Sequence, residues 1–265
     1  MNDQPATAST ELLRSDQNGV AWLTLNRPQA RNALTLALMA ALDAELATIA
    51  ENPAIHVVVI AGAGSAFCSG HDLREMRARP QREAYEQTFG LCSRVMQHIV
   101  QLPKPVIARV HGIATAAGCQ LVATCDLAIA ADTARFATPG VDIGLFCSTP
   151  MVALTRAVGR KAAMEMLLTG ELIDAAKAQA LGLVNRVVPE TGLDAAVTAL
   201  AGAIAGKSPL TLAIGKEAFY RQAELTLADA YAYAAEVMTR NMMARDAEEG
   251  IDAFLQKRTP VWSGT

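Results

Sequence analysis

The hydrophobic pattern of the first third of the chain switches between two periods. In residues 19–28 (GVAWLTLNRP), apolar and β-favouring residues alternate up to a proline, which predicts a strand. Aliphatic residues then recur at helical spacing over 34–50 and predict an amphipathic helix. A run of β-branched residues at 57–60, closed by a glycine-rich stretch at 62–65, predicts a buried strand that leads into a loop. The order strand, helix, strand is typical of an α/β protein.

The middle of the chain continues this alternation. A second helix is predicted over 83–101, where Pro103 and Pro105 follow it, and buried strands are predicted over 106–110 and 126–130.

The pattern changes to helices from residue 161 onward. Ser208-Pro209 is typical of a helix start, Thr226 and Asp229 have the spacing of a capping box, and a long helical run extends to Ala244. We therefore expect an α/β core over residues 1–200 and a helical C-terminal region over 201–265.

Composition and charge narrow the class of protein. Of the 265 residues, 52% are hydrophobic and 18% are charged, so the chain can bury a large core. The net charge of −3 and the lack of a basic run indicate neither a nucleic-acid partner nor a membrane surface. The first 17 residues contain neither an apolar signal core nor an Arg-rich amphipathic pattern, so we expect a cytoplasmic protein.

Cysteines and histidines do not form a recognisable metal motif. The cysteine count of five is odd and no pair has C-x-x-C spacing, which favours buried, reduced thiols. The four histidines are scattered along the chain, and no metal centre is expected.

Three glycine-rich segments are candidate binding loops. Gly62 and Gly64 follow a strand, but Phe67 stands where a dinucleotide fingerprint has its third glycine, which argues against an NAD-dependent oxidoreductase. Segments 66–73 and 112–120 each place small residues after a strand and before a helix. Such turns let backbone N–H groups approach an anion closely, although they can also be simple packing turns.

Several motifs in the correct order resemble the crotonase (enoyl-CoA hydratase/isomerase) superfamily. They are LNRPxxRNAL at 25–34, AFCSGHDL at 66–73, PVIAxVHG at 105–112, the segment from Gly118 to Asp126, and residues 154–170. The match extends from about residue 12 to 258. This resemblance implies an α/β fold, a crotonase-type spiral of ββα units with a C-terminal helical trimerisation region, and assembly as a homotrimer or a dimer of trimers.

The resemblance also implies a site. Position matching assigns two backbone N–H groups, those of His71 and Ala117, to an oxyanion hole for the thioester oxygen of an acyl-CoA substrate, with no tightly bound cofactor. Phe254 and Lys257, with Arg258, match a C-terminal pattern that reaches the nucleotide in the family; a solvated basic helix end is the alternative. The other matched coenzyme A contacts are Gln29, Arg31, Ser69, Asp72, Leu73 and Arg74.

The sequence departs from the family at both catalytic glutamates. Gln120 and Gly140 stand in their places, and neither side chain exchanges a proton near neutral pH. Asp142 is a candidate replacement base, and Ser148 stands where some relatives have an acidic catalytic residue; Ser148 or Cys147 is also a candidate nucleophile.

Two further side chains near the implied thioester leave alternatives open. The His71 imidazole either titrates beside the thioester or is merely tolerated there. The Gln120 amide can orient a water molecule or bind a polar acyl group.

The sequence therefore predicts an acyl-CoA-processing enzyme in which ordinary hydration is doubtful. Isomerisation, decarboxylation, thioester hydrolysis and slow hydration stay open, and decarboxylation needs no protein base. The alternative is a non-catalytic acyl-CoA-binding or regulatory protein with the same fold.

Overall fold

The main body of the protein is built on a six-stranded sheet. The computed structural model describes residues 11–265, so the first ten residues of the N-terminal segment considered above lie outside it. The strand order is β1-β2-β3-β4-β6-β9; β1 and β2 are antiparallel, and the other neighbours are parallel. The strands are β1 (Leu12–Gln17), β2 (Val20–Leu25), β3 (Val57–Gly62), β4 (Val106–Val110), β6 (Leu127–Ala131) and β9 (Arg186–Val188).

A second, three-stranded sheet lies beside the first. Its order is β5-β7-β8, with β5 parallel to β7 and β7 antiparallel to β8. These strands are β5 (Ile113–Thr115), β7 (Arg135–Ala137) and β8 (Ile173–Asp174). Because they have only two or three residues, they show no sequence period, and the sequence did not predict them.

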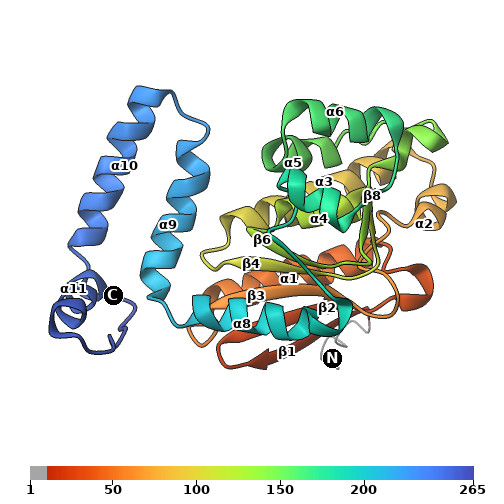
Figure 1. Ribbon diagram of the computed structural model, residues 1–265. Helices are drawn as coiled ribbons and strands as arrows, with labels where there is room; N and C mark the ends of the chain where they lie inside the picture. The colour runs from red at the N-terminus through yellow and green to blue at the C-terminus, as the bar shows by residue number, and fades with distance from the viewer. Residues whose placement is uncertain (1–10) are drawn as a thin grey trace, which may run out of the picture.

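The helices cover both sheets and form the C-terminal region (Figure 1). Those of the main body are α1 (Leu36–Glu51), α2 (Leu73–Ala78), α3 (Arg82–Gln101), α4 (Ala117–Thr124), α5 (Pro150–Ala157), α6 (Arg160–Thr169), α7 (Ala175–Leu181) and α8 (Leu193–Ala205). Then follow α9 (Pro209–Gln222), α10 (Leu227–Met242) and α11 (Arg245–Gln256), and the 3-10 turns are η1 (Pro28–Ala30), η2 (Pro139–Ile143) and η3 (Glu190–Gly192).

Strand β3 shows why the core has two sides. Val58 and Ile60 belong to the large cluster that α1, α3 and α4 complete, whereas Val57 and Val59 pack with α8 on the opposite face. Successive strand residues point to opposite faces, so a strand covered on both sides is apolar throughout. This explains the unbroken β-branched run in the sequence.

Hydrogen-bonded caps confirm the predicted helix starts at residues 208 and 226, and a further cap begins α1. The Thr35 hydroxyl accepts from Leu38 N at 3.0 Å at the start of α1, and Ser208 accepts from Thr211 N at 3.1 Å before α9. Thr226 caps α10, which ends at Met242 rather than at Ala244. Each cap satisfies one N–H that the helix itself leaves unpaired.

Helices α9, α10 and α11, which we call the C-terminal arm, project away from the sheets (Figure 1). Lys216 Nζ, on a side chain only 7% exposed, donates to Asp126 Oδ2 at 2.7 Å and to the carbonyl oxygens of Ile99 and Lys104. Tyr220 donates to the other Asp126 oxygen at 2.8 Å. These bonds fasten α9 to the main body. The expected division at residue 200 falls inside α8, which packs on the sheet.

All five cysteines, Cys68, Cys92, Cys119, Cys125 and Cys147, are buried free thiols, as expected. Within residues 11–265, no single helix has the length and apolarity to cross a membrane. The consecutive segments Glu190–Ala205 and Pro209–Gln222 meet those criteria only as a pair bent by 102°.

Candidate functional site

Two segments meet at the centre of the candidate site: one leads from β3 to α2, and the other leads from β4 through β5 to α4. Cys68 N donates to Ile113 O at 3.1 Å, and Thr115 N donates to Cys68 O at 3.0 Å. The Thr115 hydroxyl then donates to Ser69 O at 3.1 Å. The segment that ends at α2 is thus tied to the segment that ends at α4, and both glycine-rich segments chosen from the sequence meet here.

Glycines let these loops touch. A Cβ on Gly118 would lie 2.0 Å from Cys68 O, which no side chain can accommodate. Gly70 has a φ of +100°, and a Cβ there would lie 2.9 Å from Ala116 Cβ and 3.4 Å from Ala117 N. The chain at Gly70 is therefore in contact with the start of α4.

Two backbone N–H groups are left without acceptors at this contact. Leu34 N donates to Gly70 O at 2.7 Å and Leu34 O accepts from Asp72 N at 2.9 Å, so the N–H of His71, between them, faces the other way. Ala117 is the first residue of α4, where N–H groups have no intrahelical acceptor. Neither amide donates a hydrogen bond within residues 11–265. Both are available to an anionic oxygen.

Ala116 holds the turn that begins α4. Its φ of 51° and ψ of −120° place a non-glycine residue in a region that costs about 1–3 kcal/mol. Ala116 N donates to Ala137 O at 2.9 Å, and Ala116 O accepts from Gln120 N at 3.0 Å. The strained residue is thus fixed on both sides, which orients the neighbouring Ala117 amide.

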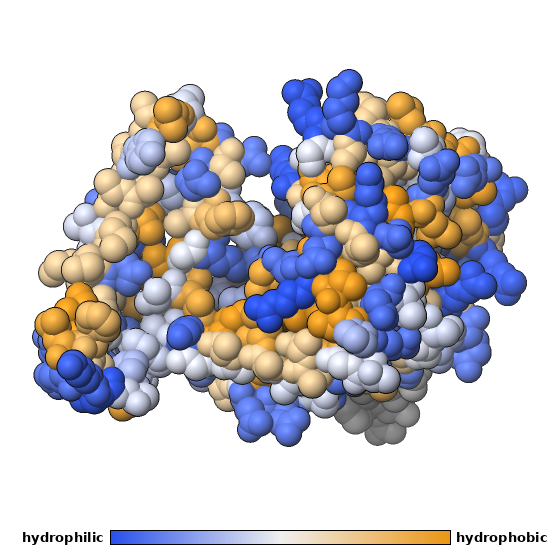
Figure 2. Space-filling view, viewed as in Figure 1, coloured by the Kyte–Doolittle hydropathy of each residue, from blue (hydrophilic) through white to orange (hydrophobic). Residues whose placement is uncertain are grey.

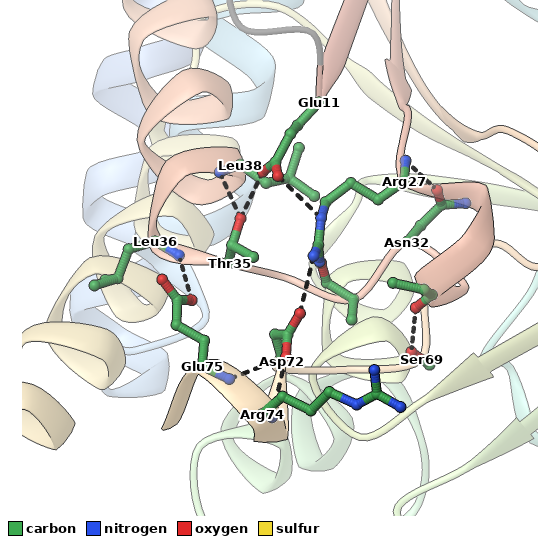
Figure 3. A network of polar contacts seen from close by, with 12 residues as sticks. Glu11, Arg27, Asn32, Thr35, Leu36, Leu38, Ser69, Asp72, Arg74 and Glu75 are labelled. Atoms are coloured by element: carbon green, nitrogen blue, oxygen red, sulfur yellow. Dashed lines mark hydrogen bonds and ion pairs between the residues drawn. The ribbon is translucent and has the colours of Figure 1, made fainter. Parts of the chain in front are cut away.

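A polar network braces the loop before α2 (Figure 3). Arg27 donates to Asp72 Oδ2 at 2.9 Å and to Ala33 O at 2.6 Å, and it pairs with Glu11 at 3.0 Å. The other Asp72 oxygen caps α2 by accepting from the backbone N–H groups of residues 74 and 75. Burial opposes ionisation of Asp72, but these N–H groups and the guanidinium prevail and lower its pKa.

Asn32 braces the same region from inside. Its side chain is fully buried, accepts from Arg27 N at 2.8 Å, and donates to the carbonyl oxygens of Ala63 and Ala66. Both Asn32 and Arg27 belong to the LNRPxxRNAL motif, but no sequence pattern assigned them a role. Their long-range partners show that they position the loop.

The structure brings most of the proposed coenzyme A contacts together. Ser69 N donates to Arg31 O at 3.0 Å and the Ser69 hydroxyl contacts Ala30 O at 3.4 Å, so η1 adjoins the start of α2. Gln29 and Arg31 are exposed on η1 and at its end, and Leu73 and Arg74 are exposed on α2. Asp72 differs from this group because Arg27 and α2 already occupy its carboxylate.

The C-terminal candidates do not join this cluster within one chain. Phe254 lies on α11, Lys257 follows that helix, and Arg258 pairs with Glu249 at 2.6 Å. Figure 1 shows α11 and α2 at opposite ends of the molecule.

The two positions at which the family has its catalytic glutamates, 120 and 140, are both enclosed by neighbouring residues. Gln120 is 4% exposed, and its Oε1 accepts from the Cys92 thiol at 3.9 Å. A Cβ on Gly140 would lie 2.6 Å from Leu145 O and 2.8 Å from Cys147 Sγ. Position 140 therefore lacks room for a side chain as well as lacking a carboxylate.

The replacement candidates lie apart from these residues. Asp142 is exposed, and both its carboxylate oxygens lie 3.2 Å from where Gly170 would carry a Cβ, beside the end of α6. Ser148 is exposed, and its hydroxyl donates to Phe146 O at 3.3 Å. Among the described residues, no hydrogen bond joins Asp142 or Ser148 to Gln120 or His71, and no group of ligands suits a metal ion.

Helix α3 borders the site, and this contact was not predicted from the sequence. The His71 ring packs edge-on against Phe89, with 5.5 Å between ring centroids. Cys92, three residues further along α3, contacts Gln120. Residues three apart lie on one helix face, so a single face of α3 lines both side chains.

Comparisons with known proteins match the chain to one family. The enoyl-CoA hydratase/isomerase family matches residues 15–265. A Xenopus laevis protein named enoyl-CoA hydratase domain-containing protein 3, mitochondrial, is 47% identical over 247 residues, covering 93% of this chain and 84% of that protein. These matches confirm the resemblance seen in the sequence.

Solved structures give the same result for the fold. An enoyl-CoA hydratase from Mycobacterium smegmatis is 56% identical, with a TM-score of 0.93 over 96% of this chain and 99% of that one. The human enoyl-CoA hydratase domain-containing protein 3 is 46% identical, with a TM-score of 0.93 over 95% and 100% of the two chains. The expected crotonase-type fold is confirmed.

The expected cytoplasmic location is contradicted. The relatives from Xenopus laevis, rat, mouse and human are all named as mitochondrial proteins. The expectation rested on the missing signal pattern in the first 17 residues, and the structure describes only the last seven of these.

Proposed function

The chain belongs to the enoyl-CoA hydratase/isomerase family, and on this basis we propose that it processes acyl-CoA thioesters through an oxyanion hole. The backbone N–H groups of His71 and Ala117 donate to the thioester oxygen. The observation that supports this most is that both N–H groups lack acceptors in the described chain, on loops that touch at Gly70. Such donors stabilise the negative charge that develops on the oxygen when the adjacent carbon becomes enolate-like.

Helix α4 adds to this stabilisation. Its eight residues begin at Ala117, and the positive end of its dipole lies where the charge develops. The first turn of α4 is buried, so water does not screen this field strongly.

We place the coenzyme A moiety across η1 and the start of α2. Gln29, Arg31, Ser69, Leu73 and Arg74 gather there, and the two arginines supply positive charge for phosphate groups. Asp72 acts indirectly, because it holds the loop through Arg27 rather than facing a ligand.

Hydration by the usual two-carboxylate route is not the expected reaction. Gln120 cannot act as an acid or base near neutral pH, and Gly140 is packed against the 145–147 segment. A reaction whose carbanion arises without a protein base, such as decarboxylation, still gains from the oxyanion hole. Because relatives such as the 2,3-dehydroadipyl-CoA hydratase of Escherichia coli, 38% identical, are named as hydratases, hydration belongs in the test.

We also propose that the arm docks onto a second copy of the chain, in a trimer. Figure 2 shows apolar side chains spread over this arm, and Leu227, Met243 and Phe254 are 76%, 83% and 82% exposed. Exposed apolar surface of this extent is typical of an interface. A trimer would let Phe254 and Lys257 approach the site of a neighbouring chain. Light scattering after gel filtration should give three or six times 27.9 kDa.

A panel of acyl-CoAs tests the function. Saturated, enoyl, 3-hydroxyacyl and α-carboxylated thioesters are incubated with the protein, and products are measured by mass spectrometry alongside affinity by calorimetry. Turnover above background on one class supports the enzyme. Binding of the thioesters without turnover favours the alternative, a non-catalytic acyl-CoA-binding protein, and no binding at all refutes both.

A further inference from the structure

The His71 imidazole holds one polar atom that no described residue binds. Its Nε2 is shielded from solvent and has no hydrogen-bond partner within residues 11–265. The ring packs against Phe89 at an interplanar angle of 78°. Burial lowers the pKa of His71 to about 4, so the imidazole is neutral at physiological pH. A shielded nitrogen without a hydrogen-bond partner lowers the stability of the protein, and a ligand that supplies the missing partner removes that cost on binding.

The ring lies beside the proposed oxyanion hole, because the backbone N–H of the same residue is one of its two donors. The backbone N–H of the same residue faces the proposed thioester oxygen, while Phe89, which the ring contacts, lies on an open face of α3. Gln120 approaches the same helix face one turn further on, through Cys92. The side chain of His71 therefore stands between the proposed position of the carbonyl and α3.

The charges on α3 near Phe89 limit which polar group of an acyl chain would be favoured beside His71. Among the described residues of α3 around Phe89, from Arg82 to Ser93, Arg82 is the one cation, and Glu86 pairs with it at 2.7 Å. A carboxylate on the acyl chain would thus meet no unpaired cation there. A hydroxyl group fits better because it can donate to or accept from Nε2, whichever tautomer the imidazole adopts.

We propose that His71 is a specificity-determining residue that selects acyl-CoA thioesters carrying a hydroxyl group on the acyl chain, through a hydrogen bond between that hydroxyl and Nε2. This inference rests on the proposed function, since it assumes that the acyl chain leaves the oxyanion hole along α3. A purely hydrocarbon chain would leave Nε2 without a partner, as it is in the free protein, whereas a hydroxyl group would supply one, and a buried polar group that only one of two similar ligands can satisfy discriminates between them.

Matched ligands test the proposal. Calorimetry compares hexanoyl-CoA with its 3-, 4- and 5-hydroxy derivatives, which differ by one oxygen at a known position. The wild-type protein should bind at least one hydroxy derivative about tenfold more tightly than hexanoyl-CoA. His71→Phe should abolish that ratio, because it keeps the backbone N–H and the ring packing but removes the nitrogen.

Two more variants separate this effect from general damage. His71→Asn keeps a hydrogen-bonding side chain and should retain part of the ratio. His98→Phe, at a partly buried histidine on α3 that pairs with Asp43 of α1 at 3.1 Å, should leave the ratio unchanged. Circular dichroism and gel filtration identify folded variants.

Each result leads to a definite conclusion. Equal binding of hexanoyl-CoA and all three hydroxy derivatives overturns the assignment of His71 but leaves the proposed function standing. A hydroxyl preference that survives in His71→Phe also overturns it. If no coenzyme A thioester binds the wild-type protein, the proposed function fails and this inference fails with it.

Discussion

The contact between Gly118 and Cys68 gives the sharpest test of how the proposed oxyanion hole is built. In Gly118→Ala the new Cβ would lie 2.0 Å from Cys68 O and 2.7 Å from Cys68 C. Normal contact needs about 3.5 Å, so the two loops must separate by roughly 1.5 Å. Both atoms belong to the backbone, so no side-chain rotation relieves the clash.

The expected size of the effect follows from that displacement. Overpacking of this kind typically costs about 1–3 kcal/mol of stability. Moving one donor by more than 1 Å from a developing oxyanion costs about 10²-fold in rate. We therefore expect Gly118→Ala to lower the melting temperature and to lower kcat/KM about 10²-fold on any acyl-CoA that the protein turns over.

Infrared spectroscopy gives a readout that needs no turnover. The carbonyl stretch of a ¹³C-labelled acyl-CoA should move to lower frequency on binding the wild-type protein, because two N–H groups polarise it, and less so in the variant. The matched control is Gly215→Ala in α9, where a Cβ meets nothing within 4 Å. That change should raise stability by about 0.5–1 kcal/mol and leave the carbonyl frequency alone. Equal stability and an equal frequency shift in Gly118→Ala and wild type would refute the reasoning.

Three further predictions concern charge and burial. Burial lowers the pKa of His71 to about 4 in the folded protein, against ~6.5 in the unfolded chain. The free energy of unfolding of the wild-type protein should therefore fall by up to roughly 3 kcal/mol as the pH drops from 6.5 to 4. Urea titrations of His71→Phe should not show this pH dependence. Asp72→Asn should cost about 1–3 kcal/mol near pH 7, because the lowered pKa of Asp72 adds stability above ~3.9, and variant and wild type should converge as pH falls through the folded-state pKa. Asp174→Asn, at a helix cap for which no arginine pairing is described, should cost only a few tenths of a kcal/mol of stability in the same urea titrations. Lys216→Met should expose the link before α9 to limited proteolysis, whereas Lys207→Met, at an exposed position, should not.

Much of the fold could be predicted because its long elements carry strong local signals. Strand β4 was predicted with its observed bounds, and α1 and α3 were predicted within one or two residues of theirs. Strand β1 lay in a polar hairpin with only its first residue buried, so its pattern was too weak to recognise. Strands β5, β7 and β8 depend on pairing between distant segments rather than on local periodicity.

The candidate site divides in the same way. The resemblance selected His71, Ala117 and the proposed coenzyme A contacts because those residues sit in contiguous motifs, and their roles stay predictions. The packing of Phe89 against His71 and the filled space around Gly140 depend on tertiary contacts that no motif encodes. The roles of Arg27 and Asn32 became visible only through partners 31 to 45 residues away.

A crystal structure with a non-hydrolysable acyl-CoA analogue bound, one whose carbonyl is retained, tests the central claim most directly. The account predicts that the carbonyl oxygen lies about 2.7–3.1 Å from both the His71 and the Ala117 backbone nitrogens. A carbonyl bound elsewhere, or held by only one of the two, would contradict it.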